Sequence, residues 1–476
     1  MNAARAAGAG AAGSVWAGEW VAGRLDVRPA DGDRPLGVGL SDLVGLAVRR
    51  NPRRAHLLVS AVLGKHVPTD PRLVYGAGRL LGELVRAVLT GVPAATGPLG
   101  ALLARALADE PGAAGAACAL RDRLREPRAP VDAVVLGYAE TATALGHSVA
   151  DALGGAYYLH STRRPVAGFA TYGGFEEEHS HATSHLLLPA DPSDLETDAP
   201  LVLVDDELST GRTVLNTIEA LHALRPRRHY VLAALVDLRG EDDRARMAGL
   251  GARLGARIDA VALAGGRVEL PDGILEAGLS LVAELEREPP GETARSVNGA
   301  RSGAGEGVAR VDVGWPRGLP EGGRHGFAPH DRERLDKELP AMAARLVPAV
   351  REGKRVLVLG FEELMYAPLR LAEALADALP EAAVRYSTTT RSPVLAVDDP
   401  GYAIRTRLRF PAHDDPADGP GERYAYNVDA GFDTIVLVVD EPGDTAALRD
   451  GLLAELAAPA RVVLVVIPEE AARCAR

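Results

Sequence analysis

Short apolar runs alternate with amphipathic stretches along residues 131–254, and this pattern predicts strands and helices in turn. Strands are expected over residues 131–137, 155–161, 201–204 and 230–237, and helices over residues 143–153 and 213–224. Strands that alternate with helices of about 10 to 15 residues are typical of βαβ units on a parallel sheet covered on both faces. The first block of the chain is therefore predicted to be an α/β domain.

The segments outside this pattern suggest domain boundaries. Residues 40–124 have a mostly helical pattern, interrupted at residues 64–68. The Ala- and Gly-rich residues 1–34 are predicted to form a disordered tail. Residues 288–324 repeat Gly, Arg and Ser and are predicted to be a flexible linker, because such long loops are uncommon inside one domain. Two folded domains are therefore expected, over residues 35–287 and 325–476.

The second block repeats the pattern of the first. Residues 356–363 resemble residues 134–140, since both combine an apolar run with a Gly and an acidic residue before a predicted helix. The segments at 162–165 and 390–393 both read Thr-Arg-x-Pro. We therefore predict that the blocks are copies of one sheet architecture, and that the second is a degenerate copy. The alternative is that any two α/β domains share this succession of strands, turns and helices.

Composition narrows the class of protein. The chain has 53 basic and 65 acidic residues, and this net charge of -12 argues against a general nucleic-acid binder. Two cysteines, Cys118 and Cys474, cannot form a disulfide framework or a CxxC zinc site, so a reducing cytoplasm is predicted. No apolar run is long enough for a membrane span. A cytoplasmic enzyme or small-molecule binder is expected.

The strongest chemical signal follows the predicted strand at residues 201–204. The strand ends in Asp205 and Asp206, and residues 209–213 form a hydroxyl- and Gly-containing loop that opens a helix. Backbone N–H groups of such a loop bind anions, and paired carboxylates accept hydrogen bonds from two ribose hydroxyls. The sequence thus predicts a ribose 5-phosphate site. The alternative is an ordinary turn with a Ser or Thr N-cap.

This segment resembles the PRPP motif of type I phosphoribosyltransferases, which has four apolar residues, two acids, two variable residues and a Ser/Thr-Thr-Gly-x-Thr loop. The resemblance implies the type I fold, transfer of phosphoribose from PRPP to a nitrogen acceptor, dependence on Mg2+ and a homodimer. It implies that Asp205 and Asp206 bind the ribose hydroxyls and, indirectly, magnesium. The implied 5-phosphate loop consists of Ser209, Thr210, Gly211, Arg212 and Thr213.

The resemblance also places a pyrophosphate site after the first strand. The loop at that position contains Gly137, Tyr138, Ala139, Glu140 and Thr141. Arg163 and Arg164 follow the second strand, where relatives place basic residues against the leaving pyrophosphate. The alternative for the loop is an ordinary βα turn capped by Thr141. The alternative for the two arginines is that they are surface residues.

Further candidates lie in two other loops. Lys65 is one of only three lysines, so a compact contact to phosphate is predicted for it, and His66 beside it is expected over the acceptor. Residues 168–189 are expected to form a lid. Its candidate acceptor contacts are Glu178, His179 and His181. Alternatively, His179, His181 and His185 form a metal site, and Lys65 is an incidental loop residue.

The second block departs from the PRPP motif. Val439 stands where Asp205 is expected, and Asp444 in the following loop would repel a phosphate, so this copy is not expected to bind PRPP normally. Residues 390–393 read Thr-Arg-Ser-Pro, which resembles the TRSP domain found behind orotate-phosphoribosyltransferase-like domains in bacterial tellurium-resistance and stress gene clusters. That resemblance implies synthesis of a nucleotide-like metabolite. The alternatives are a non-catalytic PRPP-binding regulator and an interaction protein.

Overall fold

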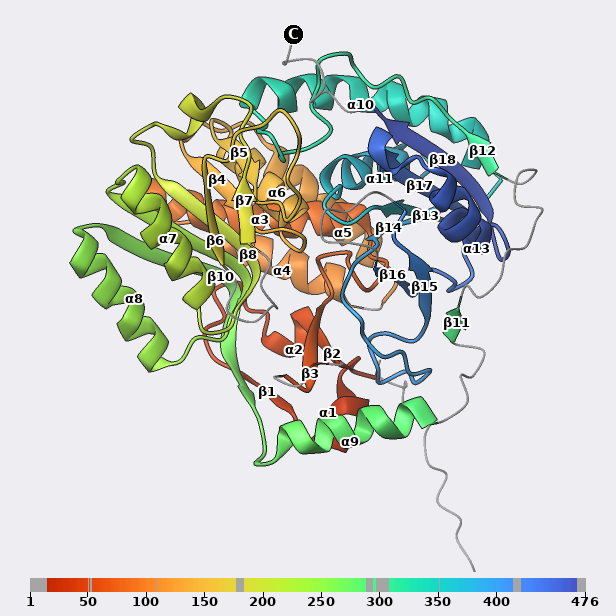
Figure 1. Ribbon diagram of the computed structural model, residues 1–476, viewed down its shortest axis with the longest axis horizontal. Helices are drawn as coiled ribbons and strands as arrows, with labels where there is room; N and C mark the ends of the chain where they lie inside the picture. The colour runs from red at the N-terminus through yellow and green to blue at the C-terminus, as the bar shows by residue number, and fades with distance from the viewer. Residues whose placement is uncertain are drawn as a thin grey trace, which may run out of the picture.

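Figure 1 shows two α/β halves side by side, with the first half in red to green and the second in cyan to blue. The computed structural model describes residues 15–49, 51, 54–108, 110–176, 184–287, 294–296, 308–350, 352–413 and 421–468. We call the described residues up to 287 the first half and those from 294 onwards the second half.

The first half is built on a six-stranded sheet with the order β1-β10-β9-β8-β4-β5. All neighbouring strands are parallel except β1, which runs antiparallel to β10. The strands are β1 (Arg28–Asp31), β4 (Val134–Gly137), β5 (Tyr157–His160), β8 (Leu201–Leu208), β9 (His229–Asp237) and β10 (Arg257–Glu269). The predicted parallel α/β sheet is confirmed.

The second half has a parallel five-stranded sheet with the order β12-β18-β17-β13-β14. Its strands are β12 (Val308–Arg310), β13 (Arg355–Gly360), β14 (Ala383–Thr388), β17 (Thr434–Asp440) and β18 (Arg461–Ile467). Strand β13 lies between β14 and β17, as β4 lies between β5 and β8. The halves therefore share one order of neighbouring strands.

Helices fill the space between the two sheets. They include α3 (Pro71–Thr90), α4 (Thr96–Leu107), α5 (Ala113–Arg125), α6 (Thr143–Leu153), α10 (Pro329–Val350) and α11 (Tyr366–Ala378). Helices α6 and α11 follow equivalent strands, and each of them packs against α3. One buried core runs through these helices and both sheets, and each half also has a smaller core of its own.

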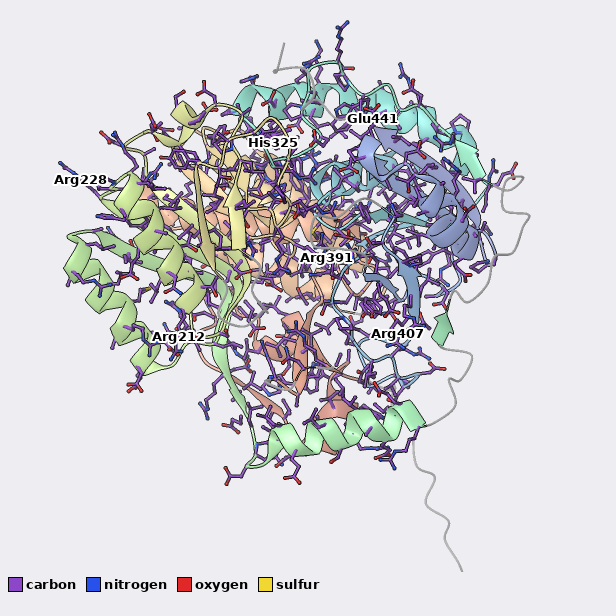
Figure 2. All side chains as sticks on the ribbon, viewed as in Figure 1. Arg212, Arg228, His325, Arg391, Arg407 and Glu441 are labelled. Carbon is purple, nitrogen blue, oxygen red and sulfur yellow. The ribbon has the colours of Figure 1, made fainter. Side chains whose placement is uncertain are left out.

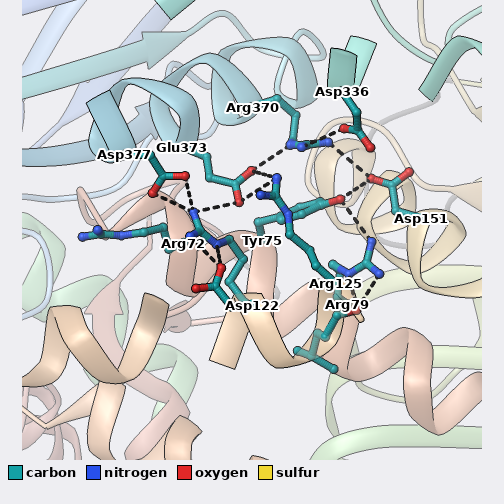
Figure 3. A network of polar contacts seen from close by, with 12 residues as sticks. Arg72, Tyr75, Arg79, Asp122, Arg125, Asp151, Asp336, Arg370, Glu373 and Asp377 are labelled. Carbon is teal, nitrogen blue, oxygen red and sulfur yellow. Dashed lines mark hydrogen bonds and ion pairs between the residues drawn. The ribbon is translucent and has the colours of Figure 1, made fainter. Parts of the chain in front are cut away.

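A buried polar network joins the helices of the two halves (Figure 3). The Asp151 carboxylate on α6 accepts hydrogen bonds from the Tyr75 hydroxyl on α3, at 2.8 Å, and from the Tyr366 hydroxyl on α11, at 2.7 Å. Arg370 is fully buried and pairs with Glu373 at 2.9 Å. Asp151 and Arg370 thus have polar partners across and along the interface.

The remaining elements complete both halves. In the first half they are α1 (Glu19–Leu25), α2 (Leu40–Leu43), β2 (Val44–Val48), β3 (His56–Ser60), β6 (Gly173–Glu176), β7 (Ser184–Leu187), η1 (Pro192–Leu195), α7 (Arg212–Leu224), α8 (Glu241–Leu254) and α9 (Ile274–Arg287). In the second half they are β11 (Ala294–Ser296), β15 (Arg407–Pro411), β16 (Glu422–Tyr426), η2 (Glu441–Gly443), α12 (Ala446–Leu448), η3 (Arg449–Leu453) and α13 (Ala454–Leu456). None of the helices among the described residues is long and apolar enough to cross a membrane.

Part of the segment predicted to be helical is a β-hairpin. Strands β2 and β3 pair antiparallel, with Val44 opposite Ser60 and Val48 opposite His56. Strand β2 is buried along its whole length, and the apolar pattern of a fully buried strand cannot be distinguished from that of a buried helix. The Asn-Pro pair at 51–52 does not fit a helix interior, so it indicates a turn between the two strands.

Within the described residues, parts of the predicted tail and of the predicted linker form helices and strands. Residues 15–34 contain α1 and β1, and the Trp16 indole donates a hydrogen bond to the Val44 carbonyl at 2.9 Å. Trp20 packs edge-to-face on Tyr402 of the second half at 5.3 Å. Strand β12 lies inside the predicted linker and pairs with β18. The biased composition of these segments obscured the apolar residues that anchor them.

Two related turns interlock the halves. The turns read Gly-Lys-His at 64–66 and Gly-Arg-His at 323–325, and each precedes a long helix, α3 or α10. After the first turn, Thr69 and Tyr386 of β14 exchange backbone hydrogen bonds at 3.0 and 2.8 Å. After the second, Phe327 and Tyr158 of β5 do the same at 2.8 and 2.9 Å. Each half therefore pairs with the edge strand of the other, which supports the predicted duplication.

Candidate active site

One cavity of about 720 Å³ lies at the carboxyl ends of β4 and β8 and is lined by residues of both halves. Figure 2 shows Arg212 in the first half and Arg391 near the centre of the molecule, where the halves meet. The carboxyl ends of parallel strands are the usual place for ligands in open α/β sheets. The cavity is therefore the candidate active site.

The two predicted acids stand at the end of β8, which is longer than expected and reaches Leu208. Asp205 and Asp206 are half-buried and line the cavity. The Asp205 carboxylate accepts a hydrogen bond from the Asp206 backbone N–H at 2.9 Å. The next acid, Glu207, pairs with Arg54 at 2.9 Å. All three acids line the cavity, and the third is paired with an arginine of the β2–β3 hairpin.

The predicted 5-phosphate loop connects β8 to α7. Gly211 has φ 70° and is the N-cap of α7, a conformation that favours glycine. Ser209, Thr210 and Thr213 are half-buried, and all three line the cavity. The loop therefore directs three hydroxyl-bearing residues and the N-terminus of a 13-residue helix toward one place. This geometry suits a phosphate.

The predicted pyrophosphate loop connects β4 to α6. The Ala139 N–H donates to the Ser161 hydroxyl at 3.0 Å, which fixes the loop against the end of β5. Thr141 is not the helix cap, because the N-cap of α6 is Ala142 and makes no side-chain cap bond. The Thr141 hydroxyl instead accepts a hydrogen bond from Lys65 Nζ at 3.1 Å.

Lys65 and His66 both line this end of the cavity. The Lys65 ammonium is buried, with its Nζ 3.8 Å from a Glu140 carboxylate oxygen. The His66 ring packs near Tyr426 at 5.5 Å. Burial, with the positive charges of Lys65 and Arg49, holds the pKa of His66 well below its usual value. His66 is therefore a neutral ring at pH 7.

The two predicted pyrophosphate-binding arginines, Arg163 and Arg164, lie in different surroundings. Arg163 lines the cavity. The Arg164 guanidinium pairs with Glu362 of the second half at 2.6 Å and is not part of the cavity wall. Arg164 thus lies apart from the cavity wall because a buried carboxylate across the interface engages it, and its contact to pyrophosphate stays a prediction.

The sequence reasoning missed a contribution from the second half. Arg391 Nε lies 3.1 Å from one carboxylate oxygen of Glu140 and 2.8 Å from an oxygen of Glu362. The Thr390 hydroxyl donates to the other Glu140 oxygen at 3.2 Å. Both residues line the cavity. The signal for it is the repeated Thr-Arg-x-Pro turn, in which Arg391 has the same position as Arg163.

The predicted lid is only partly described. Glu178, His179 and His181 lie outside the described residues. His185 on β7 is buried, with Nδ1 2.9 Å from the Ser161 hydroxyl, and stacks on Phe175 at 4.9 Å. The described ranges contain no group of three His, Cys, Asp or Glu side chains suited to a metal ion.

The equivalent loop of the second half is satisfied internally. The Asp440 carboxylate accepts from the Gly443 N–H at 3.2 Å, and Asp444 pairs with Arg310 at 2.7 Å. The cavity beside Glu363 holds about 10 Å³, which is room for one water at most. These contacts support the expectation that this copy does not take PRPP in the normal way.

Two family models match the chain. Residues 43–267 match the model described as phosphoribosyl transferase, an enzyme class within the glycosyltransferases. Residues 321–456 match the model of the TRSP domain that lies C-terminal to that transferase domain. The two matches indicate a phosphoribosyl transferase domain followed by a TRSP domain, as the two sequence motifs predicted.

Solved structures of adenine phosphoribosyltransferases are similar at a low level. The enzyme from Trypanosoma brucei is 18% identical, with a TM-score of 0.22, over 30% of this chain and 60% of its own. The Giardia lamblia enzyme is 17% identical, with a TM-score of 0.21, over 34% of this chain and 78% of its own. The Leishmania tarentolae enzyme is 18% identical, with a TM-score of 0.22, over 40% and 78%. No curated protein matches the chain.

Proposed function

We propose that this protein is a Mg2+-dependent phosphoribosyltransferase that moves ribose 5-phosphate from PRPP to a base-like nitrogen acceptor. The observation that carries the proposal is the single cavity of about 720 Å³, which both the Asp-Asp loop and the β4–α6 loop line. Its volume suits a sugar phosphate together with an acceptor.

Each part of PRPP has a matching part of the cavity. Residues 209–213 would hold the 5-phosphate at the N-terminus of α7. Asp205 and Asp206 would accept hydrogen bonds from the two ribose hydroxyls. Residues 137–141, with Lys65 and Arg163, would surround the pyrophosphate.

The chemistry follows from this arrangement. The C1–oxygen bond breaks, its electron pair leaves with pyrophosphate, and the acceptor nitrogen forms the new bond to C1. Negative charge grows on the leaving group, where Lys65 and Arg163 stabilise it. Positive charge grows on the ribose, beside the carboxylates of Asp205 and Asp206.

The carboxylates fit a magnesium ion, since Mg2+ binds through one or two carboxylates and keeps its own waters. Asp205 and Asp206 are half-buried, adjacent and on the cavity wall. Held there, the ion would neutralise charge on the leaving pyrophosphate.

The acceptor would enter from the side of His66, whose ring is neutral at pH 7 and can share a hydrogen bond with a base. The product would be a nucleotide-like metabolite. The stress and tellurium-resistance setting, the cytoplasmic location and the homodimer stay predictions from the sequence.

The test is pyrophosphate release from PRPP and Mg2+ across a panel of bases and small nitrogen acceptors. Turnover with one acceptor, lost in the Asp205→Asn/Asp206→Asn variant and on chelation of the metal, supports the proposal. The matched control is Asp198→Asn, a surface acid paired with Arg225. PRPP binding without turnover favours a regulator, and absence of PRPP binding refutes the proposal.

A further inference from the structure

The second half contributes a basic side chain to the cavity of the first. The two Thr-Arg-x-Pro turns follow equivalent edge strands, β5 and β14. Their arginines, Arg163 and Arg391, both line the same cavity, although they belong to different halves. Duplication of the fold has therefore placed two copies of one arginine around one site.

We propose that Arg391 is a substrate-contacting residue that binds the pyrophosphate of PRPP, and that Glu140 positions it. The inference rests on the proposed function and extends it, because it makes the cavity incomplete without the second half. It assigns a role in the reaction to the Thr-Arg-Ser-Pro turn.

Charge at this end of the cavity supports an anionic ligand. Three basic side chains, Lys65, Arg163 and Arg391, line the cavity with the Glu140 carboxylate, and the buried Glu362 carboxylate lies 2.8 Å from Arg391 Nε. Glu140 is 7% exposed and lies within 3.8 Å of Lys65 Nζ and 3.1 Å of Arg391 Nε. Basic groups in excess of acids at a partly closed site favour a ligand of high negative charge, such as pyrophosphate.

The geometry holds Arg391 in place before any ligand arrives. Nε faces oxygens of Glu140 and Glu362, at 3.1 and 2.8 Å, and the guanidinium is mostly buried. Glu362 is itself buried and also pairs with Arg164 and Arg423. A guanidinium has five N–H donors in a planar fork, so it can meet a carboxylate and a phosphate together. A side chain fixed in this way loses little entropy on binding.

The threonines of the two turns cross the interface in both directions. Thr390 donates to Glu140 of the first half, and Thr162 donates to Glu363 of the second half at 2.9 Å. Glu363 also lies 3.3 Å from Arg324 and accepts a hydrogen bond from the Arg163 backbone N–H at 3.4 Å. The threonine contacts thus serve the interface in both halves, and both turn arginines line the one cavity.

The experiment measures the binding of inorganic pyrophosphate and the binding of ribose 5-phosphate separately, because each compound represents one part of PRPP. We expect Arg391→Ala to weaken inorganic pyrophosphate binding, with Mg2+ present, about tenfold or more. Ribose 5-phosphate should bind within about twofold of wild type, because the 5-phosphate loop is untouched. Arg391→Lys should restore part of the lost affinity. The matched control is Arg405→Ala, which removes an exposed arginine of the second half that pairs with Asp398.

Glu140→Gln tests the positioning role. It should lower pyrophosphate affinity and kcat, and its effect should not add to that of Arg391→Ala, since both act on one contact. Equal losses for both compounds, or no loss of pyrophosphate affinity in either Arg391 variant, would mean that Arg391 serves only the interface and would overturn the inference. If wild type binds no ribose 5-phosphate, the proposed function fails, and the inference falls with it.

Discussion

Glu363 offers a sharp test of how the halves are held together. Its carboxylate is 5% exposed, accepts a hydrogen bond from Thr162 across the interface and faces Arg324 at 3.3 Å. Burial alone would raise its pKa, but the Arg324 charge, neighbouring cations and the Thr162 hydroxyl together lower the pKa to about 2. The usual pKa of this group is 4.5.

A lowered pKa means that the ionised group stabilises the folded state. The gap between about 2 when folded and 4.5 when unfolded is worth about 3 kcal/mol. This contribution is fully present above pH 4.5 and is lost as the pH falls through 2. By linkage, about 2 kcal/mol of it should be gone at pH 3.

The perturbation is Glu363→Gln, which mimics the protonated acid in shape. We expect the variant to unfold about 3 kcal/mol more easily than wild type at pH 7, and the difference to shrink by about 2 kcal/mol at pH 3. Urea unfolding at both pH values measures it. The control is Glu422→Gln, which removes an exposed pair with Arg409 and should cost under about 1 kcal/mol. A difference between wild type and Glu363→Gln that is equal at pH 7 and pH 3 would refute this reasoning.

Two further predictions concern the same interface. Gly323→Ala should destabilise the protein by about 1 to 3 kcal/mol in urea unfolding, because the added methyl would overlap the Tyr158 ring. Gly322→Ala, whose methyl would meet nothing within 4 Å, is the matched control and should be nearly neutral; equal losses in the two variants would contradict the packing argument. Asp151→Ala should cost about 3 kcal/mol, because it leaves two buried tyrosine hydroxyls without their acceptor. A loss below about 1 kcal/mol by thermal or urea unfolding would contradict that account.

The sequence predicted the parts of the fold where its local signals agree. The expected helix at 143–153 has the observed bounds of α6, and β4, β5, β8 and β9 lie where apolar runs placed them. Strand β4, the first four residues of β8 and all of β9 except its first residue are buried, as expected for central strands of a parallel sheet covered on both faces, whose sequences are apolar runs. In these segments the apolar run in the sequence therefore predicts the buried strand directly.

The sequence failed where a residue's partner is distant in the chain. Nothing near Arg164 indicates that Glu362, 198 positions away, engages it. The same holds for Arg54 and Glu207, since the hairpin that carries Arg54 was predicted to be helical. Local periodicity reports which face is buried, but it does not report what lies opposite that face. The acids and loop of the PRPP motif were predictable because they are contiguous in sequence.

The duplication explains how the second half can depart from the PRPP motif and still line the cavity of the first half. In the second half, Val439 stands in place of the first acid, and the Asp440 carboxylate accepts a hydrogen bond from Gly443 of its own loop. The turn at 390–393 contacts Glu140 instead, and changes in that turn alter the wall of the working cavity. The two parts of the second half are therefore under different physical constraints. A substitution near Asp444 should alter only local stability, whereas one at Arg391 should alter the affinity for pyrophosphate.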